Sequence, residues 1–95
     1  MVERKIFVSP LFGRQAKKLK KSAKLALDGA VLEIFNNPSI GEAKLGDLAG
    51  VSVYKFTINK QRILLSYTYT ETEIHLLTFG GHENFYRDLS KYRKS

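Results

Sequence analysis

The sequence of 95 residues contains no cysteine and only two histidines, and each scarcity excludes a class of protein. Without cysteine, neither a disulfide framework nor a thiolate metal site can form. The histidines, His75 and His82, are seven residues apart and have no supporting cluster of carboxylates, which is a poor zinc signature. We therefore expect chemistry that uses neither a metal nor any other cofactor.

Long apolar runs are missing as well. No run approaches the roughly 18 residues that a membrane span needs, and residues 1–8 contain no apolar signal segment. The chain has no glycine-rich phosphate loop and no serine nucleophile elbow, so nucleotide hydrolysis and esterase chemistry have no support. The length suits one domain with one modest core. We expect a single cytoplasmic domain over residues 1–95 with no membrane partner.

Acidic residues are few: 9 Asp and Glu stand against 16 Lys and Arg, for a net charge of +7. Residues 1–24 hold eight of the cations and one acid, whereas residues 25–50 hold one cation and four acids. Clustered cations attract phosphate and carboxylate groups, so the pattern indicates a polyanion or an acidic protein partner. A solvated helix face that merely keeps the protein soluble is the alternative. The candidate nucleic-acid contacts are Arg14, Lys17, Lys18, Lys20 and Lys21.

A strand and two helices are predicted in the first half of the chain. The β-prone run Arg4–Val8 ends at Ser9 and Pro10, a hydroxyl cap followed by proline at the first helical position. The first helix is expected from about Pro10 to Lys20, and the second from after Ser22 to the Asn-Asn-Pro run at 36–38. The apolar positions at helical spacing are Phe12, Ala16 and Leu19 in the first helix and Leu27, Ala30, Val31 and Ile34 in the second.

Three strands are predicted in the second half, at 51–58, 63–69 and 73–79, after a loop at 38–50 that Leu45 and Leu48 would pin to the core. Connections of about three residues favour antiparallel hairpins, hence a β-meander. A short amphipathic helix is expected from about Glu83 to Lys91. The predicted order is βααβββα, an α+β fold in which a small antiparallel sheet packs on a helical hairpin.

Strand alternation places two cations on one face of that sheet. Lys55 alternates with Tyr54 and Phe56, and Arg62 is on the face opposite to Ile63 and Leu65. If the apolar sets pack on the helices, Lys55 and Arg62 emerge together on the uncovered face, near the sheet end where His82 leaves the third strand. The alternative is that both cations simply make an exposed sheet face soluble.

The segment after Gly80-Gly81 gathers several reactive groups: the imidazole of His82, the carboxylate of Glu83 and the phenol of Tyr86. The glycine pair lets the backbone turn out of the sheet. Two simpler explanations stay open, since His82 could be a helix-entry residue and Glu83 could serve the helix dipole. His75, between Ile74 and Leu76, is predicted to be a sheet-surface residue.

Three stretches resemble the RelE/ParE superfamily of bacterial type II toxins, together with the predicted order of elements. They are residues 46–56 (GDLAGVSVYKF), residues 62–67 (RILLSY) and residues 82–89 (HENFYRDL). The likeness covers nearly the whole chain. It implies an mRNA endoribonuclease that cuts message on the ribosome and contacts ribosomal RNA there. A cognate antitoxin would keep this enzyme inactive. ParE-like members share the fold but inhibit DNA gyrase, which is the alternative function.

The resemblance also implies roles for single residues. Arg62 matches the arginine that RelE directs at the scissile phosphate, and Lys55 matches a lysine that RelE uses. His82 resembles a catalytic histidine of the YafQ branch, with Tyr86 as the active-site aromatic residue. Other histidines and an acid of that branch are missing, and RelE's second C-terminal arginine has no certain counterpart, so the site mixes two patterns. Glu83 would orient His82 or act as the base.

Overall fold

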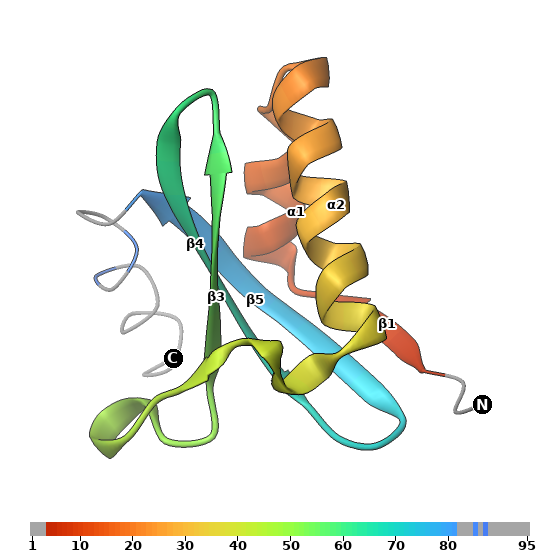
Figure 1. The fold of residues 1–95 in the computed structure, drawn as a ribbon, viewed down its shortest axis with the longest axis vertical. Helices are drawn as coiled ribbons and strands as arrows, with labels where there is room; N and C mark the ends of the chain where they lie inside the picture. Colours follow the sequence, from red (N-terminus) through yellow and green to blue (C-terminus); the bar gives the residue numbers. More distant parts are fainter. Residues whose placement is uncertain (1–3, 82–84, 86, 88–95) are drawn as a thin grey trace.

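The computed structural model describes residues 4–81, 85 and 87, apart from the side chain of Asp47. Over residues 4–81 the chain forms two helices and five strands, with two short 3₁₀ turns between α2 and β3 (Figure 1). In chain order the elements are β1 (Lys5–Val8), α1 (Pro10–Lys17), α2 (Lys21–Asn36), η1 (Pro38–Ile40), β2 (Glu42–Ala43), η2 (Gly46–Leu48), β3 (Ser52–Ile58), β4 (Gln61–Tyr69) and β5 (Glu73–Gly81).

The strands form one sheet in the order β1-β5-β4-β3-β2. The α+β prediction and the antiparallel meander β3-β4-β5 are confirmed. The sheet is larger than predicted at both edges, because β2 pairs with β3 inside the expected loop and β1 pairs with β5. The β1–β5 pairing is parallel and pairs Lys5 with Glu73, which are far apart in the sequence. No local sequence pattern therefore predicts it.

The helices begin close to where the sequence predicts. The Ser9 hydroxyl accepts a hydrogen bond from the Phe12 N–H at 3.0 Å, which is the expected cap. The first helix ends at Lys17, three residues early, where the Lys18 and Leu19 N–H groups bond to carbonyls three residues back and tighten the last turn. No helix in the described ranges is long and apolar enough to cross a membrane.

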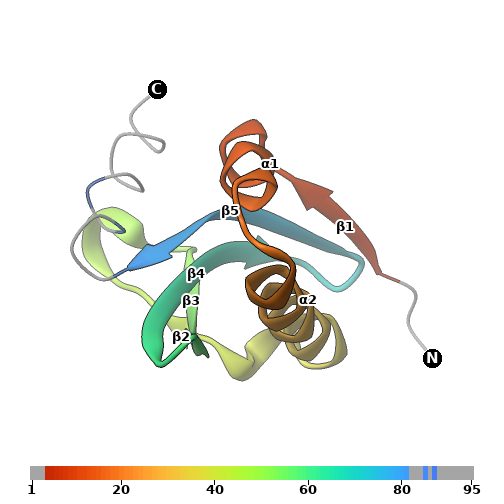
Figure 2. The same ribbon diagram turned by 90° about the horizontal axis from the view of Figure 1, so that it is seen from above.

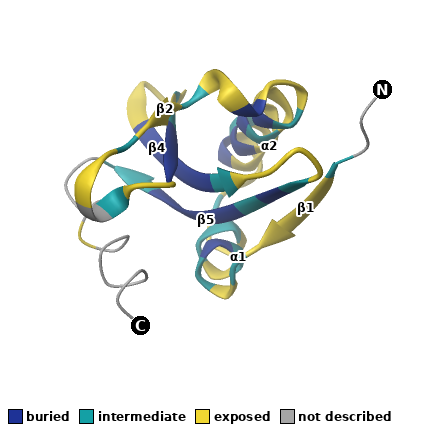
Figure 3. Cartoon of the chain, turned by 90° about the horizontal axis from the view of Figure 1, so that it is seen from below, coloured by how far each residue is buried: buried dark blue, intermediate teal, exposed yellow. Residues whose placement is uncertain are grey.

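Both helices lie on one face of the sheet. The helix α1 packs along β5, and α2 packs against β3 (Figure 2). Between helices and sheet lies the main core, and every apolar position predicted for the helices contributes to it, with Val31, Ala16 and Leu19 partly buried. The central strands β4 and β5 are largely buried, whereas all four residues of β1 are exposed (Figure 3).

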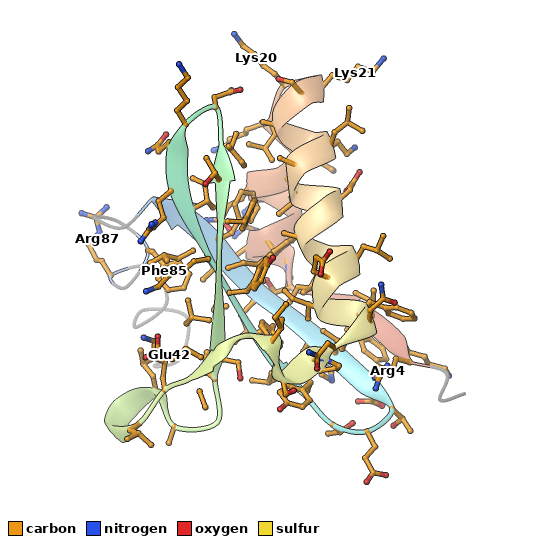
Figure 4. All side chains as sticks on the ribbon, in the orientation of Figure 1. Arg4, Lys20, Lys21, Glu42, Phe85 and Arg87 are labelled. Atoms are coloured by element: carbon orange, nitrogen blue, oxygen red, sulfur yellow. The ribbon has the colours of Figure 1, made fainter. Side chains whose placement is uncertain are left out.

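The opposite face of the sheet carries a second, smaller apolar cluster. Phe85 is 1% exposed and lies on this face, away from the helices (Figure 4). Leu48 packs against the cluster as predicted, but Leu45 is 88% exposed, so the prediction that Leu45 pins the loop was wrong. The predicted C-terminal helix falls outside the described residues except for Phe85 and Arg87, which are helical. The buried residues of this second apolar cluster are Val51, Val53, Leu64, Leu77 and Phe85.

The loop after α2 is held by a buried tyrosine. The Tyr67 hydroxyl donates a hydrogen bond to the Pro38 carbonyl at 2.6 Å and accepts one from the Gly41 N–H at 3.0 Å. A Cβ atom added to Gly41 would lie 2.6 Å from this hydroxyl, so the close approach requires glycine. Burial raises the pKa of Tyr67 above 10, because the phenolate would lose its hydration.

Replacing Tyr67 with Phe is expected to lower the free energy of unfolding by about 1–3 kcal/mol, because a carbonyl and an N–H lose their partner. Chemical denaturation measures this, with Tyr69→Phe as the control, since Tyr69 is 42% exposed.

The raised pKa of Tyr67 also predicts how stability depends on pH. In the native state the Tyr67 hydroxyl keeps its proton to a higher pH than in the unfolded chain. Wild-type stability should therefore fall as the pH rises above about 10, and Tyr67→Phe should lack this part of the loss. If Tyr67→Phe were as stable as the control Tyr69→Phe, the assigned hydrogen bonds would be contradicted.

Candidate functional site

The two cations predicted on one face of the sheet are brought together by the β3–β4 hairpin. Thr57 is directly opposite Arg62 in the register, and Lys55 is opposite Leu64. Lys55 and Arg62 are therefore a diagonal cross-strand pair, a relation in which the two positions are about 7–8 Å apart. Long side chains at that spacing can reach the same phosphate group.

The turn of this hairpin fixes which residues face each other. Asn59 and Lys60 both have positive φ, 48° and 69°, so the strands are joined by a two-residue turn of the type that matches strand twist. The expected connection was three residues, 59–61, but Gln61 is already paired with Ile58. A slip of one residue would turn Arg62 toward the core face.

The face that carries the cations is only partly uncovered. Leu64, opposite Lys55, is fully buried in the second apolar cluster, whereas Lys55, Thr57 and Arg62 are exposed beyond its edge. The prediction of a wholly uncovered face therefore needs this correction. The cations stand at the rim of an apolar patch.

The electrostatics of the hairpin have one sign. Residues 48–70 contain three cations and no Asp or Glu. Lys44 forms an ion pair with Glu42, but neither Lys55 nor Arg62 has a carboxylate partner within the described part of the chain. Cations without neutralising neighbours are available to an anionic ligand.

The strand β5 ends beside this pair. Its last residue, Gly81, is paired with Ile63, the neighbour of Arg62 in β4. The side chain of Gln61 lies against Gly81, where an added Cβ would be 3.2 Å from its Nε2. The remaining predicted site residues follow Gly81 in the sequence and lie outside the described residues: His82, Glu83 and Tyr86.

The cations predicted to bind nucleic acid are grouped around the junction of the two helices. All five are exposed. Lys20 and Lys21 point away from the body at the end of the molecule where the β3–β4 turn also lies (Figure 4). The five lie in α1 (Arg14, Lys17), at its end (Lys18), and at the start of α2 (Lys20, Lys21).

The second histidine is far from the cation pair. His75 is paired with Thr68, six residues along β4 from Arg62, which corresponds to about 20 Å. Its ring stacks on Phe7 with centroids 4.8 Å apart, and its Nε2 is 3.0 Å from a Glu73 carboxylate oxygen. The structure thus agrees with its prediction as a sheet-surface residue. Among described residues no group of three or more His, Asp and Glu side chains could hold a metal.

Sequence reasoning assigned no role to Thr57, although alternation placed it on the face of Lys55. The structure makes Thr57 the direct cross-strand partner of Arg62. The signal that could have found it was the turn: two residues with Asn first indicate a tight hairpin, and this fixes the register.

Comparison with known proteins gives one family and one fold. Residues 6–90 match the family model described as "ParE-like toxin of type II bacterial toxin-antitoxin system". No curated protein matches the sequence.

Several solved structures are similar in fold. A mutant of the E. coli toxin RelE in the free state matches with a TM-score of 0.67 and 16% identity over 96% of this chain and 98% of that one. E. coli YafQ matches with a TM-score of 0.63 and 17% identity over 88% and 99%. A chain of the intact E. coli RelBE toxin–antitoxin complex matches with a TM-score of 0.63 and 17% identity over 80% and 93%.

Proposed function

The chain belongs to the ParE-like toxins of type II bacterial toxin–antitoxin systems, and from this premise we propose that it is an endoribonuclease that cuts messenger RNA on the ribosome. Its fold is that of RelE and YafQ. The resemblance of Lys55, Arg62 and His82 to residues of that branch implies RNA cleavage and the inhibition of translation.

One observation carries the proposal: Lys55 and Arg62 are exposed on one face of a fully paired hairpin, close enough to hold one phosphate, beside the end of β5. The sequence continues from that end into His82. Cleavage of RNA without a metal needs cationic groups at the phosphate and a group that titrates near neutral pH. A protein that only binds a partner has no need for both.

The proposed reaction is attack by the ribose 2′-oxygen on the adjacent phosphorus, with loss of the 5′-oxygen. A base takes the 2′-hydroxyl proton, and an acid gives a proton to the leaving 5′-oxygen, so a cyclic phosphate and a free 5′-hydroxyl result. Arg62 holds the charge that develops on the phosphate, and Lys55 shares this role or activates the 2′-hydroxyl. His82 is the acid or the base.

Two further residues support this chemistry in the proposal. Tyr86 stacks on a base or orients the substrate, because single-stranded RNA is held largely by aromatic stacking. Glu83 orients His82 or serves as the base itself. The cations at the helix junction, Arg14, Lys17, Lys18, Lys20 and Lys21, bind ribosomal RNA phosphates, an interaction that high salt would weaken.

The partner that restrains the toxin is an antitoxin. RelE structures similar to this chain were solved with the antitoxin RelB or a RelB peptide. For this chain we propose an acidic, partly helical segment that folds on binding and covers the basic surface and the exposed part of the sheet.

A second function is favoured by the family match itself, since the matching family is named after ParE. In that case the same exposed cations dock on DNA gyrase, and no bond is broken.

Controlled expression in bacterial cells separates the two targets. If the chain is a ribonuclease, induction should fragment messenger RNA within minutes while plasmid supercoiling stays normal. If it is a gyrase inhibitor, supercoiling should be lost first and message should stay intact. Message that remains intact while growth stops would overturn the ribonuclease proposal.

A further inference from the structure

Thr57 is an uncharged residue on the same sheet face as Lys55 and Arg62, and its side chain has no hydrogen-bond partner among the described residues. It is exposed and is paired directly with Arg62. A hydroxyl can both donate and accept, whereas the flanking cations only donate.

The backbone that carries this hydroxyl is held in place. Thr57 lies inside a strand that pairs at every residue from Ser52 to Ile58, and the tight turn follows two residues later. Its β-branched side chain restricts rotation about χ1. Side chains directly opposite each other on antiparallel strands have Cβ atoms about 5 Å apart. A group that Arg62 holds close to the strands therefore lies within reach of the Thr57 hydroxyl.

In an RNA strand, the group next to a phosphate is a ribose 2′-hydroxyl, which is also a donor and an acceptor. We propose that Thr57 hydrogen-bonds a ribose 2′-hydroxyl next to the phosphate held by Lys55 and Arg62, and so selects RNA over DNA. The 2′-hydroxyl is the group by which a protein can tell the two nucleic acids apart at a single site. The inference rests on the proposed function, because it takes single-stranded RNA as the ligand.

The cations alone cannot supply this selection. DNA and RNA carry the same phosphate charge, so Lys55 and Arg62 attract both strands equally. Deleting the Thr57 hydroxyl should therefore weaken RNA binding and leave DNA binding unchanged. A residue that only supports the fold would change both.

The test compares wild-type protein with Thr57→Val, which keeps the shape and removes the hydroxyl, and with Thr57→Ser, which keeps the hydroxyl. Fluorescence anisotropy at low salt measures the affinity for labelled single strands of RNA and DNA of one sequence, and a gel at the end checks that the RNA is intact. The matched control is Thr72→Val, an exposed threonine in the β4–β5 turn at the other end of the sheet.

The wild type should bind RNA more tightly than DNA. Thr57→Val should lose about 3- to 10-fold in RNA affinity, the range for one hydrogen bond, with DNA affinity within about twofold. Thr57→Ser and Thr72→Val should retain the preference. A Thr57→Val protein with the wild-type RNA preference overturns this inference alone. A wild type that binds neither strand, or binds both equally, likewise overturns this inference, whereas the proposed cleavage is tested separately on programmed ribosomes.

Discussion

Replacing Arg62 with Ala is expected to slow cleavage of ribosome-bound message by about 100- to 1000-fold, the cost of removing one group that stabilises transition-state charge. The side chain is exposed near the start of β4. The free energy of unfolding should therefore change by no more than about 0.5 kcal/mol. The rate is measured on programmed ribosomes with purified protein, and stability is measured by denaturant unfolding of the same preparation.

Two companion variants make the Arg62 result specific. Arg62→Lys keeps the charge but loses the planar two-pronged contact with phosphate, so it should recover only part of the rate. Lys60→Ala removes an exposed cation two residues away, in the turn, and should keep most of the activity. If folded Arg62→Ala protein cleaves within about threefold of the wild-type rate, Arg62 is not in the catalytic site.

Replacing His82 with Ala should cost about 100- to 10,000-fold in cleavage rate, the range for general acid–base groups. Imidazole is the side chain that ordinarily titrates between pH 5 and 8. The wild-type rate should accordingly change with pH in this window, and the residual rate of His82→Ala should not follow the same curve. The measurement is a pH–rate profile for both proteins with saturating ribosomes.

The chain supplies its own control for the His82 experiment. His75 is the other histidine, and it lies at the far end of the sheet, stacked on Phe7. His75→Ala should keep the wild-type rate and the same pH profile. Full cleavage or full toxicity of His82→Ala would remove the imidazole from the mechanism.

The features that could be predicted from the sequence were those that depend on a regular spacing of apolar residues within one helix or strand. Period two in the strands put Tyr54 and Phe56 on the helix side and Lys55 on the other, and the structure agrees. Helical spacing found the buried faces of α1 and α2 in the same way. The pairing of β1 with β5 was not predicted, because it depends on contacts between residues about 70 positions apart.

For the candidate site, the sequence supplied the residues and the structure supplied part of their arrangement. The joint exposure of Lys55 and Arg62 on one face follows from alternation and a short turn. Placing Thr57 opposite Arg62 requires the length of the turn between β3 and β4. The sequence predicted a turn of three residues, whereas the structure has two. The predicted roles of His82, Glu83 and Tyr86 stay predictions, as they lie outside the described residues.

The parallel pairing of β1 with β5 bears on how the chain folds as it is synthesised. The Ser9 hydroxyl also donates to the Leu77 carbonyl, and the Gln15 side chain accepts from the Thr78 hydroxyl and the Phe79 N–H. The first strand and first helix therefore have to wait for residues 73–81 before they can dock. A nascent chain interrupted before that point lacks both the β1–β5 sheet edge and the end of β5 beside Arg62, so the domain can be completed only when synthesis has nearly ended.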